Sequence, residues 1–186
     1  PYVSEDGSTA ILFEETGGGP EETVLRIRPL DRPGDNKDIV FLDGPPCDLG
    51  NRSDCPRPMA KAQAKEINKF LLKHRWVELR YYIPWLPKGQ GANCEGKTLA
   101  RHFRAQGYDF TFREPHLHIA RERDGALVAD RMDVTVPPGV CATPPRSYIE
   151  SAGIDLERRA MVVTVRSCHF NDCPNPSSYL FFRLPK

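Results

Sequence analysis

The sequence lacks the long apolar run that a membrane-spanning helix requires. No segment of its 186 residues approaches roughly 18 consecutive apolar residues. It also has little net charge, because 26 lysines and arginines nearly balance 25 aspartates and glutamates. A strong positive field is typical of proteins that bind nucleic acid without sequence preference. We therefore expect neither a transmembrane segment nor general nucleic-acid binding, although a local basic patch stays possible.

Two specific hydrolase signatures are also missing. The chain has no Gly-x-Ser-x-Gly motif, which places a nucleophilic serine on a sharp turn. It has no His-Glu-x-x-His motif, which places two zinc ligands on one helix face. Five histidines and many carboxylates can be combined on paper, but no spacing selects a catalytic set. The sequence therefore favours a non-enzymatic protein, and we assign no catalytic residue and no cofactor.

Cysteine, by contrast, is plentiful for a chain of this length. The six cysteines lie mostly in polar, proline-rich segments: Cys47, Cys55, Cys94, Cys141, Cys168 and Cys173. An even number in such segments favours disulfides, with structural zinc and free thiols as the alternatives. The sequence does not select among the 15 pairings that six cysteines allow. Proximity along the chain favours the first with the second and the fifth with the sixth, which would leave the third and fourth for each other. Disulfides require an oxidising compartment, so we expect a secreted or periplasmic protein in its mature form, without its leader.

Alternating apolar residues predict strands along most of the chain. A small antiparallel meander is expected over Thr9 to Glu15, Thr23 to Leu30 and Asp38 to Asp43. Pro115 to Asp133 is predicted to form a hairpin around the turn residues Asp124 and Gly125. Further strands are predicted over Trp76 to Ile83, Tyr108 to Glu114, Ala160 to Arg166 and Ser178 to Leu184.

Two segments have the spacing of helices. Pro58 to Arg75 places apolar residues on one face, and Lys97 to Gln106 ends at Gly107, a common helix stop. A further short helix is possible within Ser147 to Arg159. We predict an α+β fold, with a mainly antiparallel sheet, two helices packed on it and loops stapled by disulfides. The whole chain, residues 1–186, is predicted to form a single domain.

The first predicted helix also carries a row of lysines. Lys61, Lys65, Lys69 and Lys73 recur every four residues, opposite the apolar face. Such a row suits an acidic partner or phosphates. A solvated helix face is the simpler interpretation and the one we favour.

The segment Gly91 to Thr98 matches the phosphate-binding loop pattern, with Gly91 and Gly96 followed by Lys97 and Thr98. In such a loop, backbone N–H groups hold phosphates, the lysine offsets their charge and the threonine holds magnesium. Asp130, which ends an apolar run, is a candidate partner for that magnesium. Prolines interrupt the approach to the loop, whereas a buried strand normally leads directly into it. Phosphate or nucleotide binding is therefore an alternative function.

His116 and His118 flank Leu117 in a predicted strand, so both imidazoles lie on the same side and suit a metal ion. A three-residue hairpin turn would place His118 opposite Asp130. A two-residue turn would place Ile119 there. Any further ligand must come from a distant position such as His102 or His169, and a pair of solvated histidines is the simpler alternative.

The densest aromatic stretch ends at Trp85 and Leu86, between two prolines. Rigid aromatic side chains beside a proline loop suit protein recognition, so these two residues are the candidate partner contacts. The leading hypothesis is an exported, non-enzymatic binding module that contacts another protein, of the inhibitor or immunity type. Phosphate binding and metal binding are the alternatives.

Overall fold

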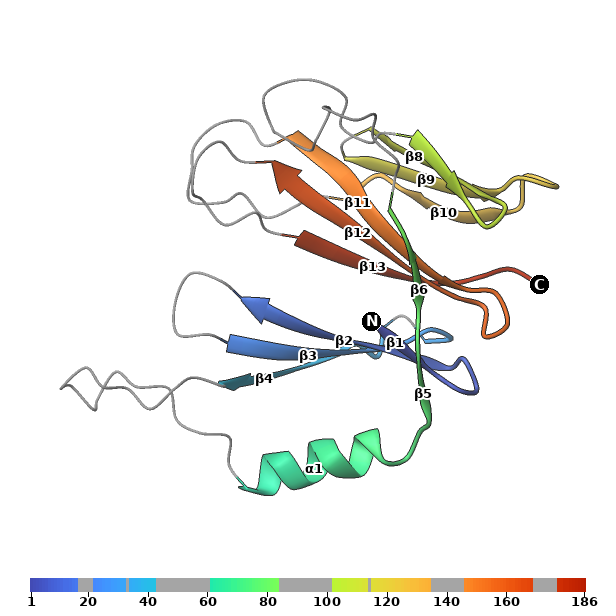
Figure 1. Ribbon diagram of the computed structural model, residues 1–186. Helices are drawn as coiled ribbons and strands as arrows, with labels where there is room; N and C mark the ends of the chain where they lie inside the picture. Colours follow the sequence, from blue (N-terminus) through green and yellow to red (C-terminus); the bar gives the residue numbers. More distant parts are fainter. Residues whose placement is uncertain are drawn as a thin grey trace. The chain divides into compact units, whose positions relative to one another are not determined.

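The computed structural model describes residues 1–16, 22–32, 34–42, 61–83, 102–113, 115–134, 146–168 and 177–186. Most of these residues lie in antiparallel β-strands, and the described part of the chain contains one α-helix (Figure 1). Contacts within the chain group it into two compact units, Pro1–Glu78 and Leu79–Lys186. The single-domain organisation stays a prediction.

The first unit is a five-stranded antiparallel sheet with the order β4-β3-β2-β1-β5. Its strands are β1 (Tyr2–Ser4), β2 (Thr9–Thr16), β3 (Glu22–Pro29), β4 (Lys37–Leu42) and β5 (Trp76–Glu78). Strands β2, β3 and β4 pair in sequence order, which confirms the predicted meander.

Helix α1 (Lys61–Leu71) confirms the helical spacing predicted there. Its buried residue Ile67 belongs to an apolar cluster with Ile11, Leu25 and Ile27 of the sheet. The Trp76 indole N–H donates to the carbonyl of Leu71 at 2.8 Å, which satisfies one of the carbonyls left free at the helix end. One face of α1 is thus packed on the sheet, and the other face stays exposed.

The second unit contains two four-stranded antiparallel sheets around one apolar core. The first sheet has the order β10-β9-β8-β7, with β7 (His102–Ala105), β8 (Tyr108–Arg113), β9 (His116–Arg121) and β10 (Leu127–Arg131). The second has the order β13-β12-β11-β6, with β6 (Arg80–Tyr82), β11 (Arg146–Asp155), β12 (Ala160–Cys168) and β13 (Ser177–Arg183). Both sheets supply fully buried side chains to the core, among them Phe110 and Leu117 from the first and Ile149 and Val163 from the second.

The predicted α+β fold with two packed helices is therefore wrong. Residues 102–106 of the second predicted helix form strand β7 and the start of a turn, and residues 97–101 lie outside the described part. Gln106 and Gly107 have φ values of 52° and 76°, and Ala105 pairs with Tyr108. Positive φ at both central residues is typical of a tight hairpin turn, so Gly107 turns a hairpin rather than ending a helix.

A second correction concerns residues 147–159, where a short helix seemed possible. Strand β11 covers most of this segment and pairs along its length with β12. Its buried residues Ala152 and Ile154 share the core with Met161 and Val163 of β12. Pairing with β12, which is rich in valine and threonine, outweighs the weak helical preference of residues 147–159.

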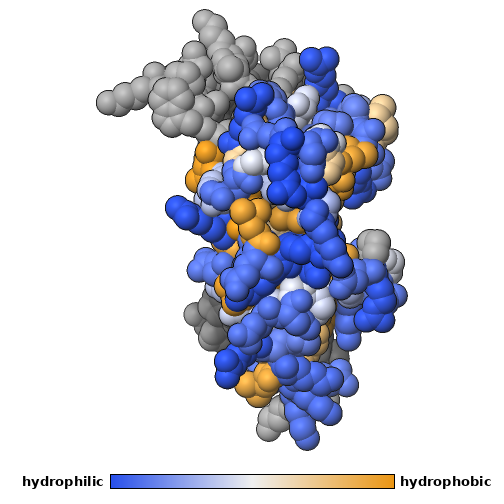
Figure 2. Space-filling view, turned by 90° about the vertical axis from the view of Figure 1, so that its right-hand side faces the viewer, coloured by the Kyte–Doolittle hydropathy of each residue, from blue (hydrophilic) through white to orange (hydrophobic). Residues whose placement is uncertain are grey.

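Figure 2 shows one face of the molecule, on which hydrophilic residues predominate and hydrophobic residues form small separate patches. Among the large apolar side chains that are exposed, Leu72 is the most exposed, at 85%. Isolated exposed apolar residues are ordinary in folded proteins. Within the described residues, no helix has the length and hydropathy that crossing a membrane would require.

Candidate metal centre

The candidate site lies on the outer face of the β9–β10 hairpin. Along β9, Leu117 and Ile119 are fully buried, whereas His116 and His118 are partly exposed. Successive side chains of a strand point to opposite faces, so the buried pair holds both imidazoles on the outer face. The prediction that the two histidines share one side of a strand is confirmed.

The turn of this hairpin is held by Arg121 and Asp124. The Arg121 guanidinium donates two hydrogen bonds to the Asp124 carboxylate, at 2.9 and 2.7 Å. The Ala126 N–H donates to the same carboxylate at 3.1 Å, and Gly125 takes a φ of 69°. Hydrogen bonds from Arg121 first, and then from Ala126, lower the pKa of Asp124 to about 2. These contacts set the point at which β10 begins to pair with β9.

Asp130 lies directly opposite His118, which is the register expected for a three-residue turn and not the one expected for a two-residue turn. The route to this register differs from the predicted three-residue turn. The Arg121 N–H donates to the carbonyl of Ala126 at 2.9 Å, which closes a turn over residues 122–125. A register shift between Leu127 and Ala129 then brings Asp130 opposite His118.

The three side chains converge. His116 Nε2 lies 2.5 Å from Asp130 Oδ1, and His118 Nδ1 lies 3.5 Å from the same oxygen. All three ligand atoms lie within 4.8 Å of one another. In a tetrahedral zinc site with bonds near 2.1 Å, ligand atoms are separated by about 3.4 Å. The three ligand atoms therefore lie near the separations that one bound ion requires.

The charge of the site suits a cation. Hydrogen bonds from His116, and secondly from His118, lower the pKa of Asp130, so its carboxylate is ionised at neutral pH. The side chains of His116, His118 and Asp130 are 37, 43 and 50% exposed, so an ion can enter from solvent. Two imidazole nitrogens and one carboxylate oxygen suit zinc, copper and other borderline transition metals.

A third histidine shares this face but is otherwise engaged. Thr111 pairs with both His102 and His118, so all three side chains lie on the same face of the sheet. His102 Nε2 lies 2.9 Å from Asp109 Oδ1, and Arg104 Nε donates to the other oxygen of Asp109 at 3.1 Å. His102, predicted as a possible further ligand, thus pairs with a different carboxylate. His169 lies outside the described residues.

Sequence reasoning missed the contact between Asp130 and His116. It considered only the position directly across the hairpin, which belongs to His118. His116 lies diagonally from Asp130, within reach of a long side chain on the same face. The sequence feature that could have revealed this contact is that His116 and His118 lie on the same side of the strand.

The other predicted sites fall largely outside the described residues. The phosphate-loop residues Gly91, Gly96, Lys97 and Thr98 lie there, as do Trp85 and Leu86. So do all the cysteines except Cys168, the last residue of β12. Asp130, which the phosphate-loop hypothesis assigned to magnesium, lies beside the two histidines instead.

None of the protein-family models, curated proteins or solved structures compared with the chain matches it. A function for this protein is therefore argued from its residues and their geometry.

Proposed function

We propose that this protein binds a divalent transition-metal ion, with zinc as the reference ion, through His116, His118 and Asp130. The observation that carries the proposal is the convergence of three ligand atoms within 4.8 Å on two strands held in register. Three protein ligands leave at least one coordination position for water or an external ligand. The exposed position of the site gives that ligand access.

Each residue has a defined part in binding. The two imidazoles supply neutral nitrogen lone pairs, and the Asp130 carboxylate offsets part of the charge of the ion. Each imidazole must be unprotonated to bind, so the affinity falls in acid and binding releases protons. The core residues Leu117 and Ile119 hold the two imidazoles on the outer face and reduce the entropy lost on binding.

Isothermal titration of the whole protein with zinc tests the proposal. Structural zinc sites with four ligands are worth about 10–16 kcal/mol, so one ligand is worth roughly 3 kcal/mol, or about a hundredfold in affinity. His116→Ala, His118→Ala and Asp130→Asn should each weaken binding on that scale. His102→Ala is the matched control, because it removes a carboxylate-paired histidine from the same sheet face. Affinity that is equal in the double variant H116A/H118A and in the control would refute the proposal.

Thiols are alternative zinc ligands, so the titration also needs a readout specific to nitrogen. Electron paramagnetic resonance of the Cu²⁺ complex should show coupling to two imidazole nitrogens, which H118A reduces to one.

We also propose that the protein is exported and holds its cysteines in disulfides, which the even number of cysteines in polar segments supports. Counting free thiols in the denatured, unreduced protein tests that proposal, because reactive thiols on all six cysteines would contradict it.

A further inference from the structure

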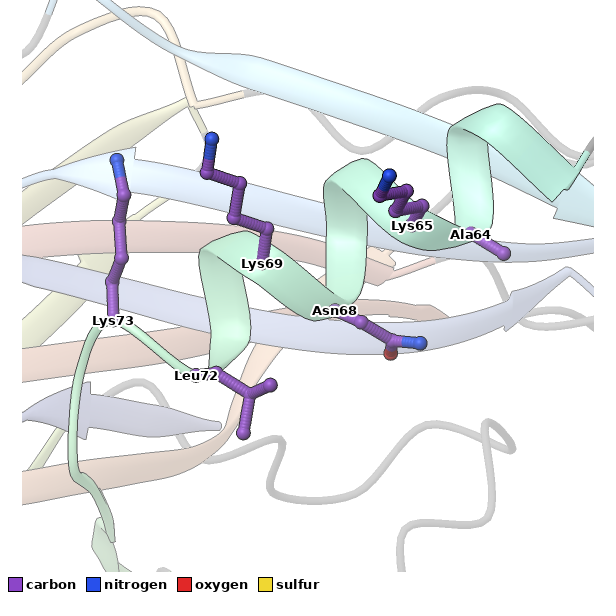
Figure 3. Close-up of a pocket in the computed structure, with 6 residues that line it drawn as sticks. All are labelled: Ala64, Lys65, Asn68, Lys69, Leu72 and Lys73. Carbon is purple, nitrogen blue, oxygen red and sulfur yellow. The ribbon is translucent and has the colours of Figure 1, made fainter.

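The exposed side of α1 carries a basic surface unrelated to the metal site. We call it the α1 basic surface, and it is a shallow hollow lined by Ala64, Lys65, Asn68, Lys69, Leu72 and Lys73 (Figure 3). The three lysines extend from the same side of the helix, and Asn68 and Leu72 extend along its other flank. Lys65 and Lys69 lie one turn apart on α1, and Lys73, in the turn just after the helix, continues the row.

These lysines have no acidic partner among the described residues. Among the described residues of the first unit, the ion pairs join other side chains, for example Arg26 with Glu14 at 2.6 Å and Arg28 with Asp38 at 2.5 Å. Lys65, Lys69 and Lys73 take part in none of them and are exposed or line the open hollow. Their charges are therefore available to a ligand that brings its own carboxylates.

The surface also has an apolar component. Leu72 is 85% exposed, although the preceding residue, Leu71, packs against the core of the unit. Ala64 and the aliphatic stems of the lysines add apolar area beside it, since lysine presents a hydrocarbon chain below its ammonium group. A ligand that fits this surface thus combines negative charge with an apolar side chain.

The basic surface is narrow. Beside the lysines, on the side away from Leu72, the exposed residue Glu66 lines a second hollow that also contains Lys37 and the ion-paired Asp35 and Asp38. A wide anionic body, such as a lipid bilayer or a nucleic-acid duplex, would approach the Glu66 carboxylate as well as the lysines. A single linear segment avoids Glu66, because it can follow the row of lysines alone.

We infer that the α1 basic surface binds an acidic segment of a partner protein, with carboxylates against Lys65, Lys69 and Lys73 and an apolar side chain against Leu72. Lys65 and Lys69, four residues apart on α1, are separated by about 6 Å along the helix. Glutamates four apart on a facing helix have the same separation, and alternate residues of an extended segment are separated by about 6.7 Å. Short acidic segments of either conformation therefore match the row.

The test uses the whole protein and a rhodamine-labelled helical peptide that carries glutamate at every fourth position with leucines beside the glutamates. Fluorescence anisotropy should show binding that weakens as salt is added, and a peptide with glutamine in place of glutamate should not bind. Each exposed pair contributes modestly, so Lys65→Gln, Lys69→Gln and Lys73→Gln should each weaken binding by about threefold. Leu72→Ser should weaken it without changing its salt dependence. Lys37→Gln, a lysine of β4 in the same unit, is the matched control and should leave binding unchanged.

A charge exchange makes the test independent of folding defects. The triple variant K65E/K69E/K73E should lose the glutamate peptide and bind a peptide with lysine at the same positions. Circular dichroism checks that α1 persists in this variant. The inference is overturned if the glutamate peptide does not bind, if the lysine variants equal the Lys37 control, or if the exchanged pair fails to bind. Loss of binding to phosphatidylserine vesicles in the same variants, without peptide binding by the native protein, would assign the surface to a membrane and also overturn it.

Discussion

Replacing Leu117 with alanine tests which face of β9 is buried, and the metal site depends on that orientation. Leu117 is 0% exposed and lies between the two histidines, in the core shared by the two sheets of the second unit. Phe112 is its direct partner on β8. Truncation leaves a cavity that a close-packed core fills only in part, so we expect a loss of about 3–5 kcal/mol in the free energy of unfolding.

Leu127→Ala on the paired strand β10 is the matched control. Leu127 is 55% exposed, so the same truncation removes about half as much buried apolar area and leaves no closed cavity. Its expected cost is about 1 kcal/mol. Comparing the two variants separates the effect of burial from that of removing a leucine side chain from the hairpin.

Urea unfolding followed by tryptophan fluorescence and circular dichroism measures both costs. A loss of 3–5 kcal/mol is a large part of the stability of an ordinary domain, so Leu117→Ala should shift the midpoint strongly. Equal, small shifts in the two variants would mean that Leu117 is not buried. His116 and His118 would then lie on the side of β9 that faces the core instead of the outer face, and the proposed metal site would lose its structural basis.

Three further outcomes are expected. Gly107→Ala should cost about 1–2 kcal/mol in urea unfolding, because Gly107 has a φ of +76° with no atom near an added Cβ, whereas Gly34→Ala, with open space and no positive φ, should be nearly neutral. The pKa of the Asp124 carboxyl is about 2, below its ordinary 3.8, so its contribution to the free energy of unfolding is complete above pH 4 and is lost as the pH falls towards 2. Asp124→Asn should therefore flatten the stability–pH curve between pH 4 and pH 2. A curve for this variant that runs parallel to that of the native protein would contradict the role of the bonds from Arg121 to Asp124. Zinc at about one hundred times its dissociation constant should raise the free energy of unfolding by about 2.7 kcal/mol in the native protein and much less in Asp130→Asn, and equal gains in both would contradict the site.

Local patterns predicted the parts of this protein in which the period of the apolar residues was clear. The meander of β2, β3 and β4, helix α1 and the two-sided strand β9 follow from spacing alone. In each case neighbouring residues in the chain decide which side chains share a face, so no distant contact is needed.

The errors arose where short segments have an ambiguous period. Residues 102–105 have Phe103 and Ala105 at alternate positions, which is the spacing of a strand. Four residues are too few for this period to be distinguished from the end of the helix predicted over Lys97 to Gln106. Phe103 stacks on Phe110 with ring centroids 4.4 Å apart, a contact that exists only once β7 pairs with β8. Strand β11 likewise takes its conformation from pairing with β12. Such preferences are set by partners far along the chain or across a turn.

The sequence by itself determined that His116 and His118 lie on one side of a strand, because side chains alternate with a period of two. Only the tertiary structure decided that this side is the outer one, since that depends on which sheet covers Leu117 and Ile119. It also decided that Asp130 meets both imidazoles, because a register shift in β10 moves every later side chain by one position. The two histidine ligands could thus be identified from the sequence, whereas the convergence of all three ligands depends on the folded hairpin.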